Sequence, residues 1–175
     1  MRGQRLALSV ARYLEPNQTL LDVGCGDMTL ARRLQPMANV EVQGLDLLDY
    51  NKTDLPMHTY EGDLYPFPDN HFDAVLLCFV LHHSKNHEQM LREARRVSKD
   101  RIIVLEDHYQ TWMGLQLTKF HDIIVNKLIC TDVACPCTFR TEEGWRTLFS
   151  QLNLSVDQTA VIRSLPGNVQ AQLLF

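Results

Sequence analysis

The segment LLDVGCGDM brings together two closely spaced glycines and two acids after a short apolar run. Gly24 and Gly26 have no side chain, so the backbone can turn sharply and approach a ligand closely. Asp22 and Asp27 flank these glycines, and a pyrophosphate bound here would be repelled by both carboxylates. The segment also lacks the third glycine of the pattern G-x-G-x-x-G, which argues against a dinucleotide oxidoreductase.

A cationic ligand reverses the sign of this electrostatic argument. S-adenosylmethionine carries an ammonium and a sulfonium but no phosphate, so Asp22 can receive the ammonium directly or through water. Gly24 and Gly26 let the backbone pack against the methionine portion. Asp46 ends the next predicted strand, where a carboxylate can accept both ribose hydroxyls. Asp63 follows the third predicted strand and, with neighbouring backbone amides, can read the adenine edge.

Alternating strands and helices are needed to position these acids. We predict strands over 19–23, 40–45, 57–60, 72–79 and 101–105, and helices over 3–14, 27–34 and 88–97. Pro36 is expected to end the second helix. The run at 72–79 is apolar after Asp73, which is typical of a parallel strand buried on both faces. This alternation predicts a doubly wound α/β sheet with ligands beyond the carboxyl ends of its strands.

The C-terminal part continues with less regular patterns. A helical pattern covers 109–128, and a second helix over 141–152 is expected to be capped by Thr141. Two further strands, about 154–163 and 168–175, are joined by the turn sequence SLPGN. No repeat or long linker interrupts the chain. We therefore expect one domain over 1–175, in which 109–139 and the helix at 3–14 form a lid and acceptor pocket.

The motifs together resemble a known family. LLDVGCGDM, GLDLLD, EGDLYPFPDNHFDAVLLCFVLHH and MLREARRV, in this order over about residues 18–105, look like the class I S-adenosylmethionine-dependent methyltransferases. Within this family, the motifs look most like those of the small-molecule methyltransferases with a D-V-G-C-G loop. TEEGWRTLFSQLNLSV resembles that family's penultimate helix and following strand. The resemblance implies a Rossmann-like seven-stranded sheet, mostly parallel, with an antiparallel last strand.

The resemblance also implies a set of cofactor-binding residues. The family pattern places Asp22, Gly24 and Gly26 in the methionine-binding loop, Asp46 and Leu47 at the ribose and the adenine wall, Asp63 and Leu64 at the adenine end, and Cys78 and Phe79 where backbone carbonyls meet the ammonium. Met28 departs from the pattern, because the family very often has glycine at this position. Its side chain either narrows the pocket or points into the core.

Candidates for a general base follow the fourth and fifth predicted strands. Methyl transfer from a sulfonium begins with an activated leaving group, so the protein mainly positions the acceptor. A base is needed only where the acceptor must lose a proton. The candidates are His82, His83, His108 and Tyr109. The His82-His83 pair is frequent in the family at the start of the helix after the fourth strand, so it is also expected to have a structural role.

Composition limits the partners. The chain has 175 residues and a net charge of −4, which argues against a protein whose main task is gripping nucleic-acid backbone. No run reaches the length of a membrane-spanning helix, and the N-terminus looks like an amphipathic helix rather than a signal peptide. We therefore expect a cytoplasmic protein with a small-molecule methyl acceptor as its partner.

The cysteines give no strong metal signal. Cys25 and Cys78 lie in apolar, strand-like settings and are expected to be free thiols. Cys130, Cys135 and Cys137 form a C-x4-C-x-C cluster, whereas zinc normally takes four ligands with more regular spacing. His121 is the nearest fourth ligand, and a surface disulfide is the other alternative. We expect no metal site.

The leading hypothesis is a methyltransferase that acts on a small or medium organic acceptor, mainly by positioning, with a histidine base where the acceptor requires one. Two alternatives remain open. The first is a methyltransferase-like binding module or partner subunit with little or no activity of its own. The second is an RNA or protein methyltransferase. An enzyme that methylates exocyclic amines of nucleic acids would carry an N-P-P-Y-type motif after the fourth strand, whereas this chain has CFVLHH there, which weakens that version.

Overall fold

The computed structural model describes residues 2–61, 63–108, 116, 138–163 and 171–174. Residue contacts divide the chain into two units. Unit 1 comprises Met1–Cys78 and Gln89–Val104, and unit 2 comprises Phe79–Glu88 and Leu105–Phe175. The single domain expected over 1–175 stays a prediction, and most of the expected lid at 109–139 lies outside the described residues.

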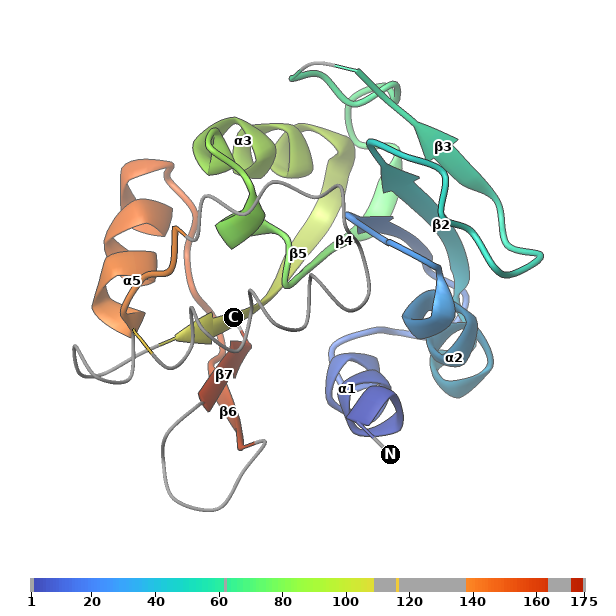
Figure 1. The fold of residues 1–175 in the computed structure, drawn as a ribbon, viewed down its shortest axis with the longest axis horizontal. Coiled ribbons are helices and arrows are strands. Elements are labelled where there is room, and N and C mark those ends of the chain that lie inside the picture. The colour runs from blue at the N-terminus through green and yellow to red at the C-terminus, as the bar shows by residue number, and fades with distance from the viewer. Residues whose placement is uncertain (1, 62, 109–115, 117–137, 164–170, 175) are drawn as a thin grey trace. The chain divides into compact units, whose positions relative to one another are not determined.

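Unit 1 is built on parallel strands. They are β1 (Thr19–Val23), β2 (Glu41–Asp46), β3 (Met57–Thr59) and β4 (Phe72–Cys78). β1 pairs with both β2 and β4, and β2 pairs with β3, all in parallel (Figure 1). β5 (Ser98–His108) follows β4 in the strand order. β1 and β4 are buried along most of their length, as expected for apolar strands covered on both faces.

Three helices accompany these strands: α1 (Arg2–Ala11), α2 (Thr29–Ala38) and α3 (His87–Val97), of which residues 89–97 belong to unit 1. Figure 1 shows α1 and α2 beside each other, with α3 across the strands from them. Each helix buries residues at helical spacing: Ala7 and Val10 in α1, Ala31 and Leu34 in α2, and Leu91 and Ala94 in α3. The alternation of strands and helices is the Rossmann-like α/β pattern predicted from the sequence.

Two predicted helix ends are wrong. Pro36 does not end α2, which continues to Ala38. A proline removes one backbone donor, but burial of Ala38 holds the last turn against the unit. Asn39, with a left-handed φ of 53°, then closes the helix by donating its N–H to the Gln35 carbonyl. The first helix ends at Ala11 instead of 14, because turn hydrogen bonds replace the helical ladder.

The described part of unit 2 contains antiparallel strand pairs and the helix α5. The end of β5 pairs with β7 (Ala171–Leu174), and β7 pairs with β6 (Ala160–Arg163), both antiparallel. β6 is shorter than the predicted 154–163, because the polar residues at 155 and 157–159 are exposed. α5 (Glu142–Gln151) begins as predicted, with Thr141 Oγ1 accepting from the Gly144 N–H at 3.1 Å. The helix predicted over 109–128 falls almost wholly outside the described residues.

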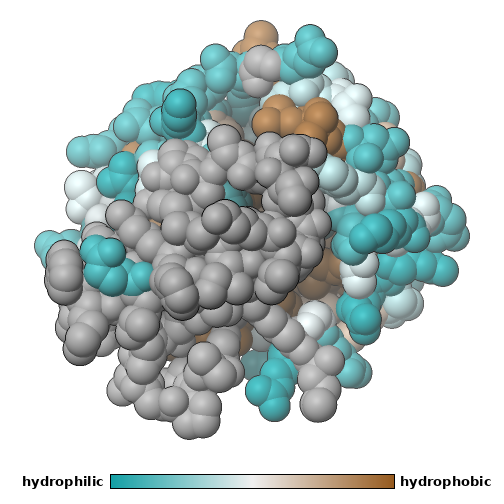
Figure 2. Space-filling model, in the orientation of Figure 1, coloured by the Kyte–Doolittle hydropathy of each residue, from teal (hydrophilic) through white to brown (hydrophobic). Residues whose placement is uncertain are grey.

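On the face seen in Figure 2, the described surface is mostly hydrophilic, with hydrophobic side chains in small groups. The exposed large apolar residues are Leu8, Met37, Leu47, Leu48, Leu64 and Val161. Among the described residues, no helix combines the length and the apolarity that a membrane crossing requires.

Candidate functional site

The glycine loop after β1 is held by backbone geometry. Gly24 and Gly26 have φ values of 68° and 53°, in the left-handed region that glycine enters without steric cost. The Gly24 N–H donates to the Leu45 carbonyl at 2.7 Å, which ties the loop to β2. A Cβ atom on Gly26 would meet no described atom within 4 Å. The backbone at Gly26 therefore borders open space.

Asp46, at the end of β2, anchors this loop with its carboxylate. Oδ2 accepts from the Gly26 N–H at 2.8 Å, and Oδ1 accepts from the Leu47 N–H at 2.7 Å. Its backbone carbonyl accepts from the Tyr60 N–H at 3.2 Å. A carboxylate offers about four lone-pair positions, so each oxygen keeps capacity for a hydroxyl donor. Asp46 is half-buried, which leaves it accessible to a ligand.

Asp22, in β1, is the most buried acid of the loop, with 2% of its surface exposed. Burial, and then the negative charge of Asp46, raise the pKa of Asp22 to about 7. Burial and the same two acids also raise the pKa of the Cys25 thiol. A buried carboxylate beside another is unfavourable in its ionised form unless a cation is bound next to it. The loop therefore fits an ammonium and disfavours a phosphate.

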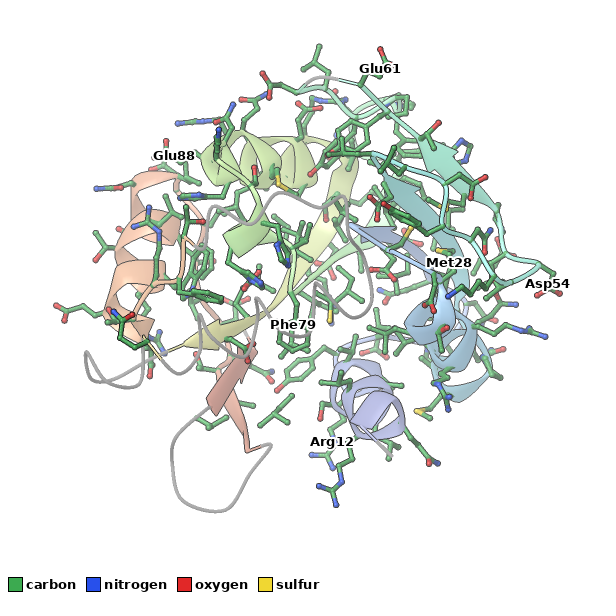
Figure 3. All side chains as sticks on the ribbon, viewed as in Figure 1. Arg12, Met28, Asp54, Glu61, Phe79 and Glu88 are labelled. Carbon is green, nitrogen blue, oxygen red and sulfur yellow. The ribbon has the colours of Figure 1, made fainter. Side chains whose placement is uncertain are left out.

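Met28 points into the core of unit 1 and not into the loop's open side. Figure 3 marks it where the loop joins α2, and its side chain is fully buried. It packs over Gly44 of β2: a Cβ there would lie 2.8 Å from Met28 Cε and 2.7 Å from Cys25 Sγ. Met28 has a φ of 62°, which costs a non-glycine residue about 1–2 kcal/mol. This cost is a physical reason for glycine at this position, and burial of the methionine side chain offsets it.

The predicted adenine end lies after β2 and β3. Leu47 is 60% and Leu64 67% exposed, and Asp63 is exposed as well. Tyr60, which was not predicted from the sequence, is half-buried directly after β3. Burial, followed by the charges of Asp46 and Asp63, raises the pKa of Tyr60. Tyr60 thus lies near both acids, and its position directly after a strand was the signal that could have identified it.

In unit 2, the chain after β4 is tied to β5. Phe79 has a φ of 55°, a strained conformation for a non-glycine residue. Its N–H donates to the Leu105 carbonyl at 2.8 Å. The next residue of β5 is Glu106, which is fully buried and was not predicted. Its Oε1 accepts from the Leu81 N–H at 2.8 Å, and its Oε2 lies 2.6 Å from His82 Nδ1.

His82 is therefore a fixed side chain. It is 1% exposed and its ring stacks on Phe139 at 4.6 Å. Its carbonyl accepts from the Thr138 N–H at 3.2 Å. A carboxylate only accepts hydrogen bonds, so Nδ1 carries the proton that points at Glu106. In the neutral ring the basic lone pair is then on Nε2. His83 is half-buried, with its ring 4.2 Å from that of His82.

The remaining predicted residues fall in different places. His82 and His83 lie in a 3-10 turn, η1 (Leu81–His83), and not at the start of α3. Cys78 ends β4 and is half-buried. His108 ends β5, but its side chain and all of Tyr109 lie outside the described residues. The described part of the chain holds no group of three or more His, Cys, Asp and Glu suited to a metal, and the cluster from Cys130 to Cys137 lies outside it.

Relatives at the sequence level are methyltransferases. Residues 21–104 match the family described as methyltransferase domain. The ubiquinone/menaquinone biosynthesis C-methyltransferase UbiE of Cupriavidus metallidurans is 31% identical over 134 residues, which are 66% of this chain and 53% of that protein. UbiE of Cupriavidus necator is 30% identical over 172 residues, with coverages of 86% and 66%. The chain thus spans about half to two thirds of the length of these relatives.

Solved structures agree in fold. A SAM-dependent methyltransferase from Methanosarcina mazei has a TM-score of 0.68 at 15% identity and covers 95% of this chain and 94% of that one. A SAM-dependent methyltransferase from Aquifex aeolicus has a TM-score of 0.64 at 16% identity, with coverages of 96% and 87%. With a match to the methyltransferase domain over residues 21–104 and the Rossmann-like α/β fold of these solved structures, the chain is similar to the S-adenosylmethionine-dependent methyltransferases.

Proposed function

We propose that the chain transfers a methyl group from S-adenosylmethionine to a small or medium organic acceptor. The observation that carries the proposal is the pair of acids at the glycine loop, the buried Asp22 and the doubly hydrogen-bonded Asp46. When bound, S-adenosylmethionine supplies a methyl group on a positively charged sulfur. The relatives are named as C-methyltransferases of ubiquinone and menaquinone biosynthesis, which supports a small organic acceptor.

In this proposal each of these residues binds a different part of the cofactor. Asp22 receives the ammonium, while Gly24 and Gly26 let the backbone lie against the methionine portion. Asp46 accepts the ribose hydroxyls with the lone pairs left over from its two backbone contacts. The carbonyls of Cys78 and Phe79 are expected to meet the ammonium.

The adenine is expected after β3. Leu47 and Leu64 expose apolar surface that a purine can cover. Asp63 accepts from the adenine edge, and we add Tyr60 as a wall because it lies near both Asp46 and Asp63. The same proposal includes a seven-stranded sheet with an antiparallel last strand. It also includes a cytoplasmic location and the absence of a nucleic-acid partner.

We further propose His82 as the general base for acceptors that must lose a proton. Glu106 fixes the His82 ring and keeps the ring proton on Nδ1, so that the lone pair is on Nε2. An orienting carboxylate has this role in other acid–base sites. His83, His108 and Tyr109 remain candidates for the same role.

Glu106→Gln is expected to lower kcat about tenfold while leaving the affinity for S-adenosylhomocysteine within about twofold. The amide can donate to His82 Nδ1, which moves the ring proton to Nε2 and removes the basic lone pair. Nitrogen-15 NMR of the His82 ring reports the tautomer, and calorimetry reports the cofactor affinity. An unchanged kcat together with a changed tautomer would remove His82 from the mechanism.

Calorimetry and a methyl-transfer assay test the function itself. We expect saturable binding of S-adenosylhomocysteine, no binding of NAD, and transfer of labelled methyl to small quinols. Cofactor binding without transfer to any acceptor would favour the binding module, and labelling of RNA or protein would favour the second alternative. Tight NAD binding without binding of S-adenosylhomocysteine would overturn the proposal.

A further inference from the structure

Unit 2 contains a second group of polar side chains, distant in sequence from the glycine loop. This group, the donor cluster, consists of His87, Arg140 and Trp145. Arg140 Nη2 lies 2.9 Å from His87 Nε2, and the guanidinium carbon lies 5.8 Å from the centre of the Trp145 ring. The rings of His87 and Trp145 are 6.1 Å apart. Trp145 is fully buried, His87 is 8% exposed and Arg140 is half-buried, so the cluster lies mostly in the interior.

The buried polar atoms of the donor cluster that have no partner among the described residues are all hydrogen-bond donors. Arginine cannot accept a hydrogen bond, so Arg140 donates to His87 Nε2, and the neutral His87 ring carries its proton on Nδ1. His87 Nδ1, Arg140 Nε and Trp145 Nε1 are buried and have no hydrogen-bond partner among the described residues. An unsatisfied buried donor loses its hydration without compensation, and native proteins contain only a few such groups per 100 residues. Three in one contacting group indicate a missing acceptor.

The positive charge of Arg140 also has no counter-charge among the described residues. Within the described chain, Arg140 forms no ion pair with a carboxylate. Of the two acids that follow it, Glu142 pairs with Arg146 at 3.0 Å and Glu143 is exposed. His87 is also the first residue of α3, an eleven-residue helix whose N-terminal end adds positive potential. Water can satisfy the donors but leaves the guanidinium without a counter-charge.

We propose that the donor cluster binds an anionic group, a carboxylate or a phosphate. Such a group supplies several acceptor lone pairs and the negative charge that Arg140 lacks. The neighbouring Phe139 stacks on His82, so the anion is held by the segment that contacts the proposed base. The anion is either a substituent of the methyl acceptor or a free ion. Only the first of these two sources rests on the proposed function.

Titration of the full chain with inorganic phosphate, at constant ionic strength set by chloride, tests the site. We expect a saturable shift of the Trp145 indole N–H signal, which Trp112→Phe distinguishes from the other indole. Arg140→Gln is expected to weaken phosphate binding at least about tenfold, because it removes a charge-assisted contact. Arg146→Gln is the matched control: it removes an equal charge six residues further on, within α5, and should bind phosphate like the wild type.

Two results would overturn the site: no saturable shift in the wild type, or equal phosphate affinity in Arg140→Gln. If that variant does not fold, the wild type still decides, because a site must give a saturable rise of the unfolding temperature with phosphate, whereas the general stabilisation by phosphate salts does not saturate. If phosphate competes with the methyl acceptor and raises the KM for it, the anion is a substituent of the acceptor. If phosphate binds and this KM is unchanged, the anion is a free ion. Calorimetry with S-adenosylhomocysteine tests the proposed function separately, so failure of one is distinguishable from failure of the other.

Discussion

Asp46→Ala is expected to weaken binding of S-adenosylhomocysteine about 100- to 1,000-fold in calorimetric titrations. The substitution removes both acceptors proposed for the ribose hydroxyls, and hydrogen bonds to charged groups contribute about 1.5–3 kcal/mol each. Since 1.4 kcal/mol corresponds to a factor of ten, two such bonds from the lower half of this energy range account for the expected loss. The substitution also leaves the Gly26 and Leu47 N–H groups without their acceptor, which loosens the glycine loop.

Asp49→Ala provides the matched control. Asp49 lies three residues further on, is exposed, and accepts only a local hydrogen bond from the Asn51 N–H at 3.0 Å. The variant has the same change in net charge, so cofactor affinity within about twofold of wild type is expected. Unchanged affinity in Asp46→Ala, or an equal loss in Asp49→Ala, contradicts the proposed role of Asp46. Equal unfolding temperatures of the two variants establish that a loss is local.

The sequence was sufficient to predict elements whose signals are local. β1 has the predicted bounds, and β4 and α3 differ by one residue, because continuous apolar runs and helical spacing encode burial directly. The acids at the ends of β1 and β2 were predictable for the same reason. In a parallel sheet the carboxyl ends of neighbouring strands lie at one edge, so strand ends locate a site.

Contacts distant in sequence could not be predicted. The Glu106 carboxylate reaches His82 across 24 positions, and Arg140 reaches His87 across 53. Nothing in the local pattern of either segment specifies the partner. The direction of the Met28 side chain depends on Gly44 in another strand, which provides the space for it. Pro36 was misjudged because tertiary burial of the last turn of α2 outweighed the local preference.

The second large effect expected is a pH dependence of cofactor affinity that Asp22 causes. Its pKa is raised to about 7 by burial and by Asp46, so only about a tenth of Asp22 is ionised at pH 6 and about three quarters at pH 7.5. An ammonium binds the ionised form, so affinity should rise about eightfold over this interval. Without ligand, folded Asp22 holds its proton to higher pH than the unfolded chain does. The free energy of unfolding should therefore fall as pH rises from about 4 to about 7.

Asp22→Asn removes the titrating group and is expected to bind about 10- to 100-fold more weakly at pH 7.5 with a nearly flat profile. The ligand's own amino group titrates identically in both proteins, so the difference between the two profiles belongs to Asp22. Asp73→Asn is the control: hydrogen bonds from Thr19, together with Lys99, hold the pKa of Asp73 at about 2, so it does not titrate in this interval. The control should retain the wild-type slope. A pH-independent affinity in the wild type, or a persistent slope in Asp22→Asn, excludes Asp22 as the ammonium's partner and leaves the glycine loop without the charge that distinguishes a cationic ligand from a phosphate.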